Sequence, residues 1–181
     1  MDAPLRDALL GEGVVEINDV AHAYEHSIEV QTPLLRYLLP DAPFVPIAVP
    51  ADAFSLSLGQ TLAGVIERDG RRIAVLASSD LTHYGADYGE TPAGTGEEGM
   101  AHAQANDEEL LDNVVNLDPE GVLEHALSER SACGGGALAA AIVAARGLGA
   151  QGCKVLEHTS SHAQEPSSES WVGYAAALFH R

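Results

Sequence analysis

The chain has 181 residues, 46% of them hydrophobic, so it can bury one good core and we expect one domain. Its 27 acids against 9 bases give a net charge of −18, and this charge argues against binding to nucleic acid or anionic membranes, which need Lys and Arg to neutralise phosphate. The apolar runs are too short to span a bilayer, and the first ten residues show no secretory signal pattern, so we expect a cytoplasmic protein.

The first half of the chain predicts a β-α-β unit. FVPIAV (residues 44–49) and RIAVLAS (residues 72–78) are short apolar runs with β-branched residues, as expected of buried strands. The segment between them has helical spacing and ends at Gly70, which suits a helix C-terminus. Upstream, an apolar face that includes Ile28 and Leu34 predicts another helix after His26.

The second half alternates in the same way. Helices are predicted for three segments: residues 100–115, a stretch from the cap Asp118 to about Glu129, and residues 136–150, ending at Gly147. CKVLEHTSS and SWVGYAAALFH, close to the C-terminus, predict two more strands. The pattern therefore favours an α/β layered fold with a central, mainly parallel sheet flanked by helices.

SSDLTHY (residues 78–84) directly follows an apolar run, at a position where sites gather in parallel sheets. Asp80, three residues before His83, can accept a ring N–H and leave the other imidazole nitrogen free for a metal, a substrate or a proton. The alternative is an aspartate that caps a turn beside a surface histidine.

HAYEHSIEVQ (residues 22–31) supplies His26, flanked by the acids Glu25 and Glu29. His26 could be a metal ligand, a helix cap or a core residue. With His22 and Glu25 it also matches the H-x-x-E-H pattern of some zinc peptidases, which requires both histidines on one continuous helix. The preceding residues indicate strand and turn, which argues against that reading.

Cys133 lies in SACGGGA, just before a predicted helix. The helix dipole and the free N–H groups at such a position favour thiolate, the form that binds metal or attacks. The alternative is a small buried residue in a tight loop. Cys153, which has no polar neighbours in its strand, is assigned to packing.

These segments together resemble the Memo family, known in prokaryotes as component B of the AmmeMemoRadiSam system. EHSIEVQ, SSDLTHY, ACGGG and SSESWVGYAAALF occur in the family's order, and the resemblance runs from about His22 to Arg181. The family is similar in fold to the class III extradiol dioxygenases, which are non-haem iron enzymes. The resemblance therefore implies a single Memo-like domain over residues 1–181.

The resemblance also implies site roles. His26 and Cys133 match the family's metal ligands for Fe(II) or copper, and His83 matches a histidine that acts as acid and base, accompanied by Asp80. Family members carry a further histidine ligand in an earlier segment of the type Pro-His-Ala-Gly-Tyr, so we expect this chain to be an N-terminally truncated form with weaker metal affinity.

Two functions follow from the resemblance. The first is a metal-dependent oxidoreductase related to the extradiol dioxygenases, with an unknown substrate. The second is a non-catalytic scaffold that keeps the pocket and binds a peptide or a small molecule. We expect no nucleic-acid or membrane partner, and self-association stays open.

Overall fold

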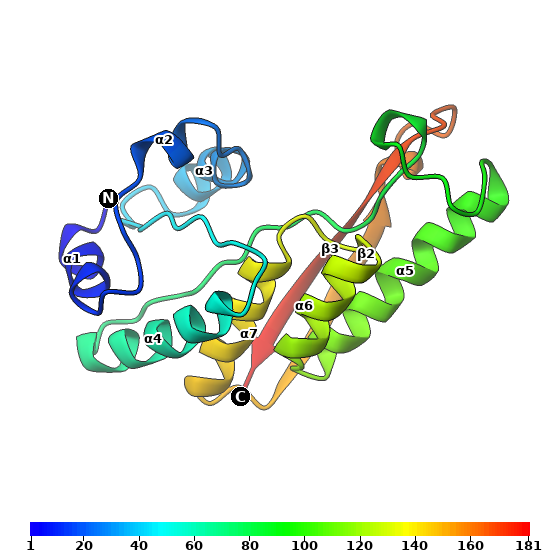
Figure 1. Ribbon diagram of the computed structural model, residues 1–181. Helices are drawn as coiled ribbons and strands as arrows, with labels where there is room; N and C mark the ends of the chain where they lie inside the picture. Colours follow the sequence, from blue (N-terminus) through cyan, green and yellow to red (C-terminus); the bar gives the residue numbers. More distant parts are fainter.

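The computed structural model describes residues 1–181, and Figure 1 shows a row of helices in front of two long strands. The α-helices are α1 (Ala3–Gly11), α2 (Asp19–Ala23), α3 (Ser27–Leu38), α4 (Phe54–Asp69), α5 (Glu97–Val115), α6 (Pro119–Ser128) and α7 (Gly135–Gly147). The strands are β1 (His83–Tyr84), β2 (Gly152–Ser160) and β3 (Trp171–His180), and the short 3₁₀ turns are η1 (Ala86–Tyr88) and η2 (Ser161–Ala163). The predicted α/β class is confirmed.

Local signals set several helix ends where the sequence predicted them. Gly70 ends α4 in the left-handed conformation, with a φ of 73° that side chains disfavour. Asp118 caps α6 by accepting the N–H of Gly121 at 3.0 Å, and Pro119 occupies the first turn, where its missing N–H costs nothing.

The sheet has the order β1-β3-β2, and both pairings are antiparallel. Tyr84 pairs with Trp171, and Ser160 pairs with Gly173. The prediction of a mainly parallel sheet was wrong. The link between β2 and β3 is short, so the chain reverses and lays the second strand antiparallel against the first.

The two runs expected to be parallel strands are extended but have no partners. No backbone–backbone hydrogen bond involves residues 45–51 or 72–79. Pro46 and Pro50 also lack the N–H that a central strand must donate. Val75 and Leu76 are 39% and 61% exposed, although their composition predicted burial. The β-α-β prediction is thus right for the helix and wrong for both strands.

The main core lies between the helices α5 to α7 and the strand β2. It is built from apolar side chains of all these elements and of the segment before β1: Leu81, Leu110, Leu111, Val114, Val122, Ile142 and Cys153. The burial of Cys153 confirms its assignment to packing and raises the pKa of its thiol. A smaller cluster stacks Tyr84 on Trp171 with ring centres 5.2 Å apart, which holds the end of SSDLTHY against β3.

The N-terminal region is packed differently from the rest. Leu5 and Leu9 of α1 pack against Val65 of α4, whereas α2 and α3 contain no buried residue. In Figure 1 these two helices stand apart from the strands. None of the helices combines the length and the apolar character that crossing a membrane requires.

Hydrogen exchange should separate the unpaired segment from the sheet. The amides of residues 72–79 have no backbone acceptor, so they should exchange at least about 100-fold faster than those of residues 154–160, which pair with β3. Exchange mass spectrometry on the purified chain measures both peptides in one experiment. Equal protection would show that residues 72–79 have found a strand partner in solution.

Candidate metal and proton-transfer site

The SSDLTHY segment presents two reactive side chains at its accessible end. Asp80 Oδ2 lies 3.3 Å from His83 Nε2, and the two side chains are 47% and 35% exposed. Leu81 and Thr82, between them, are buried. In an extended chain, side chains three residues apart point to opposite faces, so extension alone does not place Asp80 beside His83. The burial of Leu81 and Thr82 anchors the stretch between the two side chains.

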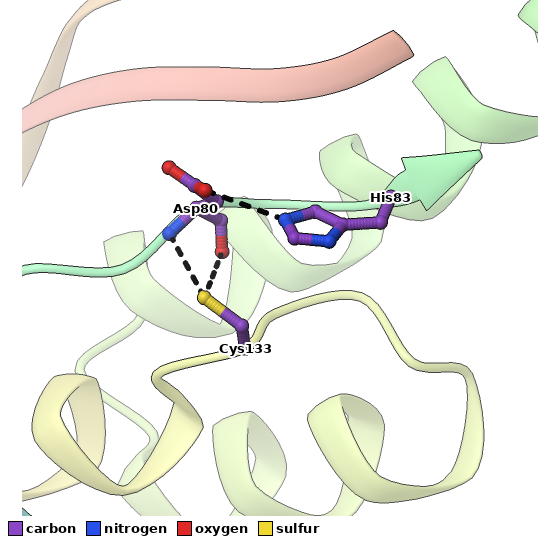
Figure 2. Close-up of side chains that lie close together, drawn as sticks. All are labelled: Asp80, His83 and Cys133. Carbon is purple, nitrogen blue, oxygen red and sulfur yellow. Dashed lines mark hydrogen bonds and ion pairs between the residues drawn. The ribbon is translucent and has the colours of Figure 1, made fainter. Parts of the chain in front are cut away.

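Cys133 reaches the same point from the loop before α7. Its N–H donates to the carbonyl of Asp80 at 3.3 Å, and the Asp80 N–H donates to Cys133 Sγ at 3.4 Å. Figure 2 shows the sulfur facing the Asp80 backbone with the His83 ring alongside. Potential ligand atoms of Asp80, His83 and Cys133 all lie within 4.8 Å of one another.

Gly134 lets the cysteine loop come this close. Its N–H donates to Ser79 Oγ at 2.9 Å. A Cβ added to Gly134 would lie 2.7 Å from Ser79 Cβ and 2.8 Å from the carbonyl oxygen of Ser78, which is shorter than real Cβ atoms approach. The glycine after Cys133 therefore has a steric function, because it allows this close backbone approach.

The EHSIEVQ segment also meets SSDLTHY, through hydroxyl and amide groups. Ser78 Oγ donates to the carbonyl of Ser27 at 3.1 Å and accepts from Gln31 Nε2 at 3.3 Å. The first turn of α3 is therefore tied to a residue two positions before Asp80. His26 immediately precedes this turn but is exposed, and it is not among the three residues whose ligand atoms converge.

Glu25 fixes the start of α3 beside His26. Its carboxylate accepts the N–H groups of Ser27 and Ile28, both at 2.9 Å. Burial acts to raise the pKa of Glu25, but the hydrogen bonds from Ser27 and Ile28 outweigh it, so this pKa lies below its ordinary value. His26 occupies the N-cap position of α3 without making a side-chain cap hydrogen bond, and it is exposed, so the helix-cap alternative holds by position and the core alternative does not.

The zinc-peptidase pattern has the wrong local structure. His22 lies in α2, which ends at Ala23, whereas His26 precedes α3. The two histidines therefore do not sit one turn apart on a continuous helix, which the H-x-x-E-H chemistry requires. The pattern thus fails as expected but for another reason: residues 19–23 are helical rather than strand and turn, and it is the break between α2 and α3 that separates the two histidines.

Two tyrosines beside the cluster were not anticipated. The ring of Tyr88 lies 4.9 Å from that of His83. Burial, the Asp80 charge and the nearby Tyr88 raise the pKa of Tyr174, so its hydroxyl stays a proton donor. Tyr88 comes from a loop and Tyr174 from a distant strand, and no local spacing in the sequence connects either one to Asp80.

Fold and cluster together define an α/β protein with a thiol, a carboxylate and an imidazole at the end of an extended segment. The family model described as Memo-like protein matches residues 1–178, and the chain belongs to the Memo family. The expected resemblance is confirmed.

Curated relatives include proteins of Methanosarcina and Thermococcus species. MEMO1 family proteins of Methanosarcina barkeri and Methanosarcina acetivorans are 31% and 33% identical, covering 98% of this chain and 63% of each relative. A MEMO1 family protein of Thermococcus kodakarensis is 32% identical and covers 93% of this chain and 61% of the relative. The chain therefore spans about three fifths of the length of these relatives.

Proposed function

We propose that this chain contributes a metal-dependent oxidoreductase site related to that of the extradiol dioxygenases. In this proposal Cys133 and His26 bind Fe(II) or copper, His83 carries protons and Asp80 orients His83. The observation that carries it is the convergence of Cys133 with Asp80 and His83 within 4.8 Å, from segments about 50 residues apart in sequence.

The donor set suits such a metal. A thiolate and imidazoles are the ligands that iron and copper accept readily, and the site is accessible to a small molecule. The 3.3 Å between His83 Nε2 and Asp80 Oδ2 is a hydrogen-bond distance, in keeping with the orienting role given to Asp80.

The position of α3 is the reason for including His26 in this proposal. The hydrogen bonds of Ser27 and Gln31 with Ser78 hold the start of α3 against the extended segment that carries Asp80. A bound Fe(II) or copper ion would supply one-electron redox chemistry at this place.

In this proposal, His83 and Asp80 carry out the proton transfer. When His83 Nε2–H donates to Asp80, its Nδ1 is left as an acceptor for the hydroxyl proton of a substrate. The Asp80 carboxylate stabilises the imidazolium that this transfer creates. Tyr88 packs beside the ring and Tyr174 supplies a nearby neutral hydroxyl, so an aromatic or hydroxylated substrate would find both stacking and hydrogen-bonding groups.

Metal loading combined with oxygen consumption tests the proposal. The anaerobically loaded chain should bind about one Fe(II) or copper ion and consume oxygen with a member of a panel of catechols and other electron-rich aromatics. His83→Ala should lower that rate by about 10²- to 10⁴-fold while metal content stays the same, and His180→Ala, an exposed histidine at the end of β3, should change neither.

The other outcomes separate the two expected functions. Bound metal with no oxygen consumption across the panel would favour the scaffold that keeps the pocket without turnover. No bound metal at any concentration tested would overturn the metal site itself.

A further inference from the structure

Two buried polar residues on α5 form hydrogen bonds with the segment that carries the site. Asp107 and Asn106 are 4% and 8% exposed. Asp107 Oδ1 accepts the N–H of Thr82 at 2.9 Å, and Asn106 Nδ2 donates to Thr82 Oγ1 at 3.1 Å. Thr82 is one of the two residues between Asp80 and His83, and both its backbone and its side chain are held by this pair.

The same carboxylate joins two more elements. Its Oδ2 lies 3.2 Å from His158 Nε2 on β2. On β3, a Cβ at Gly173 would lie 2.0 Å from Asp107 Oδ2, so only glycine leaves room for the carboxylate there. Gly173 also donates its N–H to the carbonyl of Thr82 at 3.0 Å. Asp107 therefore sits where α5, β2, β3 and SSDLTHY meet.

Such a carboxylate is expensive to bury. An ionised group removed from water must recover its lost hydration through hydrogen bonds and a charge partner. The next inward positions of the same helix, Leu110, Leu111 and Val114, pack the core with apolar side chains alone. The polar pair at positions 106 and 107 instead makes specific hydrogen bonds: all of its contacts to SSDLTHY fall on Thr82, and Asn106 also donates to the carbonyl of Glu129 at 3.0 Å.

We propose that Asp107, assisted by Asn106, is a positioning residue of the site, which fixes Thr82 so that Asp80 and His83 converge beside Cys133. Without these contacts the segment would keep its backbone hydrogen bonds to Gly173, its contacts with Cys133 and the stacking of Tyr84, but Thr82 would lose both of its side-chain partners. The roles of the three converging side chains rest on the proposed function, but their positioning can be measured without metal.

The ring of His83 reports the positioning directly. Nitrogen chemical shifts of the neutral ring in the metal-free chain should show one fixed tautomer, with Nε2–H held by Asp80. Asp107→Ala should convert it to a mixture, whereas Asp107→Asn, which keeps an acceptor for Thr82, should restore it. Asp112→Ala, an exposed acid on the same helix, is the matched control and should leave it unchanged.

A second variant covers the case in which Asp107→Ala does not fold. Thr82→Val keeps the shape of the side chain but removes the oxygen that Asn106 holds, so it should also loosen the His83 tautomer. An unchanged His83 signal in every folded variant, Thr82→Val included, would overturn the proposal.

Metal affinity is measured on the same proteins with copper as the probe. Asp107→Ala or Thr82→Val should weaken copper binding by about 10- to 100-fold, the usual effect of an outer contact on a metal site, and Asp107→Asn should recover most of the loss. If the unaltered chain binds neither copper nor Fe(II), the proposed function fails, while the His83 signal still decides whether Asp107 positions this pair.

Discussion

Valine in place of Gly134 should push the Cys133 loop away from Ser79 and Asp80 and remove metal binding. The first atom of any side chain would already lie 2.7 Å from Ser79 Cβ and 2.8 Å from the Ser78 carbonyl oxygen, and backbone cannot move aside as a flexible side chain can. We expect a destabilisation of about 1–3 kcal/mol from overpacking. Metal affinity should fall by about 100-fold or more, because the sulfur moves rather than an outer contact.

Thermal unfolding and metal titration of the same protein measure both effects. Gly11→Ala is a suitable control, because a Cβ at Gly11 would meet no atom within 4 Å. Unchanged metal affinity in a folded Gly134→Val chain would show that the approach of the cysteine loop to Asp80 is not needed for the site.

Cys133→Ala should abolish stoichiometric metal binding with little effect on the fold. Cys133 is exposed, so removing its sulfur leaves no cavity in the core, yet it removes the softest donor of the cluster. We expect an affinity loss of about 100-fold or more, measured by metal analysis after equilibrium dialysis.

Cys153→Ala gives the opposite pattern and is the matched thiol control. Cys153 is buried in the main core, so its loss should lower the melting temperature while metal content stays near one per chain. Full retention of metal by Cys133→Ala would rule out Cys133 as a ligand.

The helices were predictable because their signals are local. The glycine that ends α4 and the Asp118-Pro119 start of α6 act within one turn of chain, so the sequence alone indicates them. The sheet was not predictable in this way. An apolar run such as residues 72–78 forms a strand only if another strand pairs with it, and no segment of this chain does so.

The site was predictable only where its signals are local in the sequence. SSDLTHY indicated an aspartate–histidine pair and the position of Cys133 before a helix indicated a reactive thiol, and the structure places these groups together. Asp107 was not identified from the sequence, because its contact with Thr82 spans 25 residues and depends on how α5 packs on the sheet. Tyr174 was missed because its proximity to Asp80 depends on the pairing of β3.

X-ray absorption spectroscopy of the copper- or iron-loaded chain tests the central claim most directly, since it identifies the atoms bound to the metal. The account predicts one sulfur neighbour at about 2.3 Å together with nitrogen or oxygen neighbours, and loss of the sulfur signal in Cys133→Ala. A metal surrounded only by nitrogen and oxygen, with the same spectrum in Cys133→Ala, would contradict it.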